Sequence, residues 1–270
     1  MRTTAILNLK GGVAKTVTCV NMAAILAADY GKHVLVVDAD SQANTTDFFG
    51  GIQDKAGLSD MLRRKISERN PVELQRTTMQ NVDLISADES LMDLDLSKVE
   101  SGSVDTQCLV SVLSLLKSQE LQPAEIRQIF GGTYDYCLID CPPAFNAAAA
   151  AALLAADDVI IPIKLDAFSL RGMANLARQV RNMQEINPKL RIAGLLPTMV
   201  YPSEKIRKAL EILSISDFNI YPRIRKTNKV DDMTFAQRPL IESSPHSAAC
   251  VDYRRFLKAY LQEEGGADRG

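Results

Sequence analysis

The feature that most constrains this chain is a glycine- and lysine-containing run near its start, Lys10-Gly11-Gly12-Val13-Ala14-Lys15-Thr16. It lies between an apolar stretch of strand length, residues 4–9, and a segment with helical apolar spacing, residues 15–28, that ends before Gly31. Glycines let backbone N–H groups wrap around an anion, and a following helix adds free N–H donors and its dipole. The run therefore predicts a phosphate-binding loop, with Lys15 on the β- and γ-phosphates and the Thr16 hydroxyl on Mg²⁺.

The match to the G-x-x-x-x-G-K-[ST] pattern is imperfect. Leu9 stands where the first glycine is expected, and Ala14 replaces the glycine before the lysine. The alternative is an ordinary strand–turn–helix unit with a glycine turn, and short motifs do produce false matches. Sites further along the chain are needed to decide between the two.

Carboxylates follow two later strand-like runs. Residues 33–37 lead into Asp38 and Asp40, and residues 136–139 lead into Asp140. The carboxyl ends of parallel strands meet at one edge of a sheet, so these groups face the same crevice as the phosphates. Asp38 and Asp40 are two residues apart: one is expected to serve the lysine or the metal shell, and the other to orient the attacking water. Asp140 is expected to hold Mg²⁺, often through water. A lone acidic residue at a strand end would only aid solubility. The glycine-rich loop, the Asp38–Asp40 pair and Asp140, in this order and each at a strand end, favour a nucleoside-triphosphate site.

Apolar runs of strand length alternate with helical segments along the whole chain. Further strands are predicted at residues 82–86, 159–163 and 192–196. Continuous Val, Ile and Leu runs with helices between them predict an α/β fold, a doubly wound, mostly parallel sheet with helices on both faces. We expect one P-loop domain over residues 1–270, with a mostly helical insertion at about 59–130 and a frayed tail at 263–270.

Composition excludes several classes of protein. The net charge of −2 and pI of about 5.8 show that the chain as a whole is not basic. Any binding to nucleic acid must therefore come from a local basic patch. The five cysteines show no disulfide spacing and indicate a reducing compartment. There is no signal-peptide pattern, and the apolar stretch at residues 147–156 is shorter than the ~18 residues of a membrane helix. A cytoplasmic location is expected.

Taken together, three motifs resemble the ParA/MinD family of deviant Walker A ATPases. They are residues 10–16, in which a second lysine opens the loop, residues 38–42 (Asp-Ala-Asp-Ser-Gln) and residues 139–143 (Ile-Asp-Cys-Pro-Pro). Weaker matches at residues 196–199, 221–223 and 238–242 extend the resemblance over nearly the whole chain. The partition branch, which is Soj-like, fits best.

The resemblance implies ATP and Mg²⁺ as cofactors and an ATP-driven homodimer in which Lys10 crosses to the phosphates of the other subunit. Lys10, Lys15 and Asp40 would be the catalytic residues, Asp40 positioning water. Thr16, Asp38 and Asp140 would serve the metal. The implied ATP-binding residues are Lys10, Gly11, Gly12, Val13, Ala14, Lys15, Thr16 and Val17, with Thr198 and Pro222 close to adenine.

Two positions depart from the family pattern. Ala14 replaces a usual Gly, and Val17 replaces a usual Thr or Ser. If the backbone at Ala14 needs a positive φ, its Cβ costs on the order of 1 kcal/mol or more. We expect ATP binding to survive and turnover to be slow. A nucleotide-gated binding module with little hydrolysis is the alternative that Ala14 favours.

The resemblance also implies non-specific DNA binding, nucleoid association and a ParB-type partner that stimulates hydrolysis. The candidate DNA-binding residues are Lys205, Arg207, Lys208, Arg223, Arg225, Lys226 and Lys229. A solvated surface is the alternative interpretation of this patch. A MinD-like membrane cycle would need a basic amphipathic C-terminal helix. The apolar residues within 251–262 are better explained by a helix docked on the fold, so membrane binding is not expected.

Overall fold

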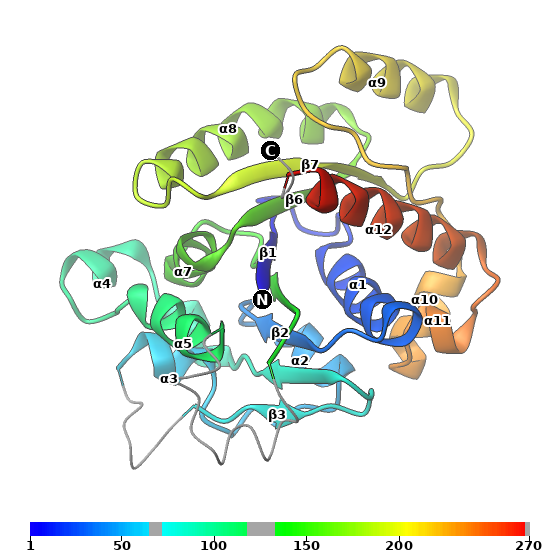
Figure 1. Cartoon of the computed structure of the whole chain (residues 1–270). Helices are drawn as coiled ribbons and strands as arrows, with labels where there is room; N and C mark the ends of the chain where they lie inside the picture. The colour runs from blue at the N-terminus through cyan, green and yellow to red at the C-terminus, as the bar shows by residue number, and fades with distance from the viewer. Residues whose placement is uncertain (65–71, 118–132, 268–270) are drawn as a thin grey trace.

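A seven-stranded sheet organises the chain, in a computed structural model that describes residues 1–64, 72–117 and 133–267. The strand order is β3-β4-β2-β5-β1-β6-β7, and every neighbouring pair is parallel except β3 with β4 (Figure 1). The strands are β1 (Arg2–Ile6), β2 (Val34–Asp38), β3 (Gln75–Arg76), β4 (Val82–Ile85), β5 (Tyr136–Asp140), β6 (Asp158–Lys164) and β7 (Arg191–Thr198). The predicted doubly wound, mostly parallel α/β fold is confirmed.

Helices cover both faces of the sheet and create two apolar cores. On one face, α1 (Lys15–Tyr30) packs beside α12 (Ala248–Ala267), with α2 (Asn44–Phe48), α10 (Lys229–Ala236) and α11 (Leu240–Ser243) nearby. The other face carries α3 (Leu58–Leu62), α4 (Leu96–Glu100), α5 (Gln107–Lys117), α7 (Ala147–Ala155), α8 (Ala167–Gln184) and α9 (Glu204–Ser214). This double coverage explains why the central strands read as continuous apolar runs.

The edges of the first βα unit differ slightly from the prediction. β1 ends at Ile6 because its partner β5 ends at Asp140, and the register pairs those two residues. Residues 7–9 therefore belong to the loop rather than to the strand. Helix α1 runs two residues beyond the predicted end at 28, and Gly31 caps it in the left-handed conformation, φ 62°, with its N–H on the Leu26 carbonyl.

The segment at 59–130 contributes to the sheet as well as adding helices. It contains α3, α4 and α5, the predicted strand β4, and the two-residue antiparallel edge strand β3, which the sequence did not indicate. Residues 65–71 and 118–132 of this segment lie outside the described part of the chain. The division into one domain with an insertion stays a prediction.

The C-terminal helix is docked by its apolar face. Tyr253, Phe256 and Tyr260 of α12 are at most 1% exposed and pack in the α1-side core. α12 continues to Ala267, past the predicted start of fraying at 263, and Glu263 accepts hydrogen bonds from Asn219 and Tyr221. The face that a membrane-binding helix would need is thus already packed against the protein. Within the described ranges, no helix has the length and apolarity to cross a bilayer.

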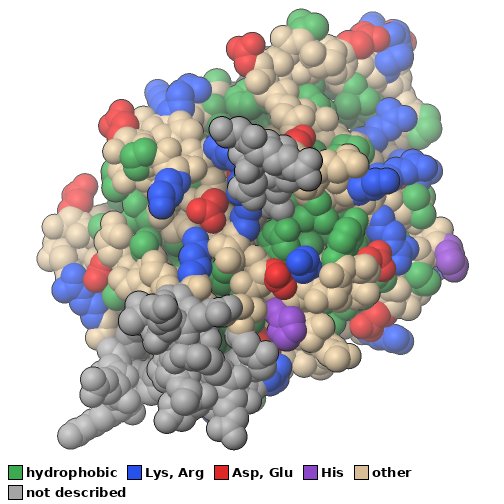
Figure 2. Space-filling model, viewed as in Figure 1, with side chains coloured by type: hydrophobic (Ala, Val, Ile, Leu, Met, Phe, Trp, Pro, Cys, Tyr) green, Lys and Arg blue, Asp and Glu red, His purple; other side chains and the backbone are tan. Residues whose placement is uncertain are grey.

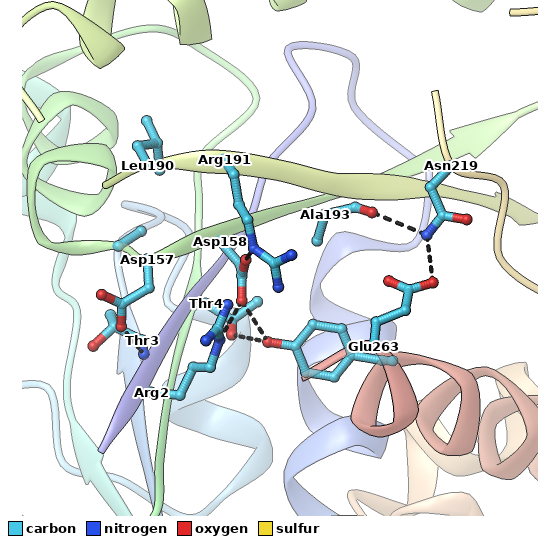
Figure 3. Close-up of polar contacts among 12 residues, drawn as sticks. Arg2, Thr3, Thr4, Asp157, Asp158, Leu190, Arg191, Ala193, Asn219 and Glu263 are labelled. Atoms are coloured by element: carbon cyan, nitrogen blue, oxygen red, sulfur yellow. Dashed lines mark hydrogen bonds and ion pairs between the residues drawn. The ribbon is translucent and has the colours of Figure 1, made fainter. Parts of the chain in front are cut away.

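A buried carboxylate ties α12 to the amino ends of three strands. Asp158 of β6 pairs with Arg2 of β1 and Arg191 of β7, and it accepts a hydrogen bond from the Tyr260 hydroxyl, which also contacts Thr4 (Figure 3). A buried charge is stable only when it is paired and hydrogen-bonded, and two guanidinium groups meet that need. This cluster lies at the end of the sheet opposite the candidate phosphate loop.

Candidate functional site

The loop between β1 and α1 has the backbone of an anion cradle. Gly12 and Ala14 both adopt the left-handed conformation, with φ of 67° and 69°. Left-handed residues interspersed in a turn direct successive N–H groups to one side, which makes a concavity for an anion. Gly11 and Gly12 are exposed, and nothing lies within 4 Å of where a Cβ would stand, so the cradle is open to a ligand.

Ala14 has the positive φ at which its Cβ was expected to be costly. Its φ of 69° and ψ of 36° lie in the region where a Cβ costs about 1 kcal/mol, and it is the residue at the start of α1. The strain is therefore located in the phosphate loop itself. Val17, the second departure, is half-buried and packs against the α1-side core.

Substituting glycine for Ala14 should relieve this strain. We expect Ala14→Gly to raise the free energy of unfolding by about 1 kcal/mol and to speed ATP turnover. Urea unfolding and steady-state phosphate release measure the two effects. Gln237→Gly is the matched control, because Gln237 is exposed and also left-handed, φ 48°, at the end of α10. The Gln237→Gly variant should gain stability without faster ATP turnover. An equal increase of the turnover rate in both variants would refute a role for strain in the loop.

Lys15 is a buried cation held inside the loop. Its residue is 7% exposed, and its Nζ donates to the Lys10 carbonyl at 3.2 Å. Burial lowers the pKa of Lys15, and the nearby Asp140 and Asp40 carboxylates oppose that effect. A desolvated ammonium with one carbonyl partner is poised to exchange that partner for a phosphate oxygen.

Asp140 joins the loop to the strand end beside it. Its Oδ2 accepts hydrogen bonds from the Thr16 and Thr45 hydroxyls, each at 2.7 Å. Its Oδ1 is buried and has no hydrogen-bond partner among the residues that the structure describes. Burial raises the pKa of Asp140 despite these two bonds. An unsatisfied buried carboxylate oxygen is costly, and a ligand at this position would remove the cost.

The residues fit a magnesium ion that is bound mainly by nucleotide and water. Mg²⁺ takes oxygen ligands and is held in such sites by one or two carboxylates plus phosphates. The oxygen of the Thr16 hydroxyl and Oδ1 of Asp140 are suitable ligands of this kind. In the described ranges no cluster of three His, Cys, Asp or Glu side chains could hold a metal alone. The ion would therefore depend on the phosphates.

Asp38, predicted to serve the metal, is hydrogen-bonded within its own loop, and its contact with a metal stays a prediction. Both of its oxygens accept protein hydrogen bonds: Oδ2 from the N–H and hydroxyl of Thr46, and Oδ1 from the N–H of Asp40. Burial and the neighbouring Asp140 raise the pKa of Asp38. We infer that Asp38 orders the loop that carries Asp40. Asp40 is half-buried and accepts one bond from the Gln42 N–H.

Lys10 and Thr198 anchor the two sides of the loop. The Lys10 N–H donates to Asn8 Oδ1, and its Nζ pairs with Asp166, just beyond β6. Thr198, at the end of β7 and 1% exposed, donates its hydroxyl to the Val13 carbonyl at 3.0 Å. Thr45 and Asp166 could not be identified from the sequence, because their partners Asp140 and Lys10 are far away in the chain, and Asn8 matched no motif.

The predicted adenine residues lie at the edge of the sheet beside β7. Pro222 is exposed, in a segment that is bonded to β7 through the Tyr221 and Ile224 N–H groups on the Leu195 and Pro197 carbonyls. The Thr198 hydroxyl is already used by the loop. Their contact with adenine stays a prediction.

The candidate DNA-binding residues differ in whether, and with which carboxylate, they form an ion pair. Arg207, Lys208 and Lys229 form exposed pairs with Glu211, Glu204 and Asp232, pairs that contribute little and are easily given up. Arg225 is different. Its guanidinium makes two bonds to Asp252, whose side chain is only 5% exposed, and this ion pair raises its pKa. The ion pair shows that Arg225 also helps to hold α12 in place, and its predicted role in DNA binding stays a prediction.

Three of the predicted basic residues are available to a ligand. Lys205, Arg223 and Lys226 are exposed and form no ion pair with any described residue. Arg207 and Arg223 line a groove of about 430 Å³ between α9 and the segment after it, with Tyr201 at its rim. Basic side chains gather over this side of the molecule, mixed with acidic and apolar ones (Figure 2).

Comparison with known proteins agrees with this geometry. A family model described as an AAA domain (AAA_31) matches residues 1–192. Sporulation initiation inhibitor protein Soj of Bacillus subtilis is 35% identical, over 94% of this chain and 96% of the relative. Chromosome-partitioning ATPase Soj of Treponema pallidum is 34% identical over 98% of both chains. Among solved structures, cobyrinic acid a,c-diamide synthase of Mycobacterium smegmatis with an ATP analogue and magnesium has a TM-score of 0.77 and 26% identity, covering 99% of this chain and 97% of that one.

Proposed function

Because the chain belongs to the ParA/MinD family of P-loop ATPases, we propose that it is a partitioning ATPase that dimerises on ATP, binds DNA without sequence preference and releases it after hydrolysis. The observation that carries this proposal is the joined set at the carboxyl ends of the strands. The Thr16 hydroxyl of the loop donates a hydrogen bond to Asp140 of β5. The negative charges of Asp140 and Asp40 both act on the buried Lys15 ammonium. These are the groups that a triphosphate, its metal ion and an attacking water require.

Each residue of the set has a distinct part in the proposed reaction. The amides of residues 11–16 receive the phosphate oxygens, and Lys15 leaves the Lys10 carbonyl to bind them. Mg²⁺, when bound near Thr16 and Asp140, would neutralise charge on the β- and γ-phosphates. Asp40, positioned by Asp38, orients water toward the γ-phosphate. Lys10 reaches the phosphates of the partner subunit, so the complete site needs two copies.

The proposed DNA surface lies on α9 and the segment after it, where Arg223 lines the groove. Phosphate contacts from Lys205, Arg223 and Lys226 would carry no sequence information, which suits non-specific binding on the nucleoid. The relative named as a chromosome-partitioning ATPase supports the partition role, and within that role we propose a ParB-type partner that stimulates hydrolysis. The strained Ala14 supports a second candidate, a nucleotide-gated DNA-binding module that scarcely turns over.

Sedimentation of the whole chain tests the proposal. The protein should be monomeric with Mg·ADP and dimeric with Mg·ATP or a slowly hydrolysed analogue, and only the dimer should shift a DNA fragment of random sequence. A protein that stays monomeric with the analogue would refute ATP-driven dimerisation. Single-turnover hydrolysis with and without DNA then separates the active ATPase from the binding module.

Charge reversal identifies the DNA surface. The double variant Arg223→Glu/Lys226→Glu should weaken DNA binding more than about tenfold and reduce the slope of log affinity against log salt by about four per dimer, without changing ATP affinity. Fluorescence anisotropy over a salt series measures both quantities. Lys55→Glu/Lys189→Glu is the matched control, since it makes the same change in net charge elsewhere. Equal losses in the two double variants would place DNA binding outside the groove.

A further inference from the structure

The Lys10 side chain is held within its own chain by a carboxylate that no motif includes. Its Nζ lies 2.8 Å from Asp166 Oδ1 and 2.7 Å from Oδ2, so the ammonium is shared between both oxygens. The two side chains are 37% and 30% exposed. A half-exposed ion pair of this geometry is stable enough to be populated and weak enough to be exchanged.

The backbone around Lys10 is fixed to the same strand end. Asn8, 8% exposed, accepts the Lys10 N–H at 3.0 Å, and its amide donates to the Pro162 carbonyl of β6 at 2.7 Å. The Asp166 N–H is in turn bonded to the Lys164 carbonyl, at the last residue of β6. Asn8 and Asp166 are thus each bonded to a carbonyl of β6, so Lys10 is positioned against its own subunit through both its backbone and its side chain.

We propose that Asp166 is a positioning residue that holds Lys10 in its own subunit and so sets how readily ATP drives dimerisation. The inference rests on the proposed function, in which Lys10 must reach the phosphates of a second copy. To reach those phosphates, the Lys10 ammonium has to leave the position in its own subunit at which Asp166 holds it. Dimerisation therefore breaks two Lys10–Asp166 pairs, one from each subunit, and the dimer forms only when the new contacts exceed their combined strength.

The expected size of the effect follows from the exposure of the pair. Loss of one such ion pair changes an equilibrium constant by up to about fivefold. Formation of each dimer breaks two of these pairs, so the two effects combine in the dimer dissociation constant. Asp166→Asn keeps the shape of the side chain and removes its charge. We expect the dissociation constant of the dimer, formed with the slowly hydrolysed ATP analogue, to fall about tenfold.

Sedimentation velocity over a protein dilution series, with Mg²⁺ and the analogue, measures this constant. Glu73→Gln is the matched control, since the Lys55–Glu73 pair is similar, at 2.9 Å and 44% and 43% exposed, and lies outside the loop. It should leave the constant unchanged. Asp166→Ser provides a second substitution, with thermal unfolding to verify that each variant is folded.

A third comparison shows whether Asp166 acts through Lys10. In a Lys10→Ala background, Asp166→Asn should have no effect on dimerisation, whereas a general structural effect would persist there. A dimer that is equally tight or weaker in Asp166→Asn, or tightened to the same extent without Lys10, would overturn the inference. Wild-type protein that remains monomeric with the analogue would instead refute the proposed function, so the two failures are distinguishable.

Discussion

Replacing Lys15 by alanine is expected to weaken ATP binding at least ~100-fold, to the point where calorimetry detects none. The lysine is buried beside the phosphate cradle, and among the described residues its ammonium hydrogen-bonds to the Lys10 carbonyl alone. Charge-assisted hydrogen bonds to a triphosphate in such a site are worth about 3 kcal/mol, and nothing else in the loop supplies a positive charge at that point.

The same substitution should leave the protein folded. Burial lowers the pKa of Lys15, which means that the cation is held at a desolvation cost in the nucleotide-free chain. Removing it should not reduce the free energy of unfolding by more than a fraction of a kcal/mol, as urea titration would show. Lys32→Ala, at an exposed pair with Asp135, is the control for losing a lysine. Tight ATP binding by folded Lys15→Ala protein would refute the assigned role.

Asp40→Asn should separate binding from hydrolysis. The asparagine keeps an acceptor for the Gln42 N–H, so the loop should hold its shape while the charge that orients water is lost. We expect ATP affinity within about threefold of wild type and single-turnover hydrolysis at least ~100-fold slower. Quench-flow measurement of phosphate release under excess enzyme gives the rate directly.

A nearby carboxylate provides the comparison for Asp40. Asp47 is exposed in α2, beyond the same loop, and its side chain accepts a hydrogen bond from Gln53. Asp47→Asn should hydrolyse ATP at the wild-type rate. Wild-type turnover by Asp40→Asn would assign water positioning to another group, and an equally slow wild type would favour the binding-module interpretation.

Local pattern predicted most of the fold and the core of the site. Continuous apolar runs placed the central strands, and Gly31 marked the end of α1 because only a left-handed residue fits there. The glycine-rich run placed the loop, and the motif flagged Ala14 as the position where strain would appear. These features depend on residues that are close in sequence, which is why they can be read from it.

What pattern could not predict are contacts between residues far apart in the chain. Asp166 meets Lys10 across 156 positions, and Thr45 meets Asp140 across 95. Arg225 was predicted as a DNA contact, and the sequence did not indicate that its guanidinium pairs with Asp252 of α12. Asp38 was predicted to serve the metal, and the sequence could not show that its oxygens accept hydrogen bonds from Thr46 and Asp40. β3 is too short to leave a periodic signal.

A crystal structure with Mg²⁺ and a slowly hydrolysed ATP analogue is the most direct measurement. The triphosphate should lie on the amides of residues 11–16, with Lys15 moved from the Lys10 carbonyl onto phosphate oxygens and the metal ion beside Thr16 and Asp140. A nucleotide bound elsewhere, with the loop empty and Lys15 still on the Lys10 carbonyl, would contradict the assignment of this loop as the ATP site.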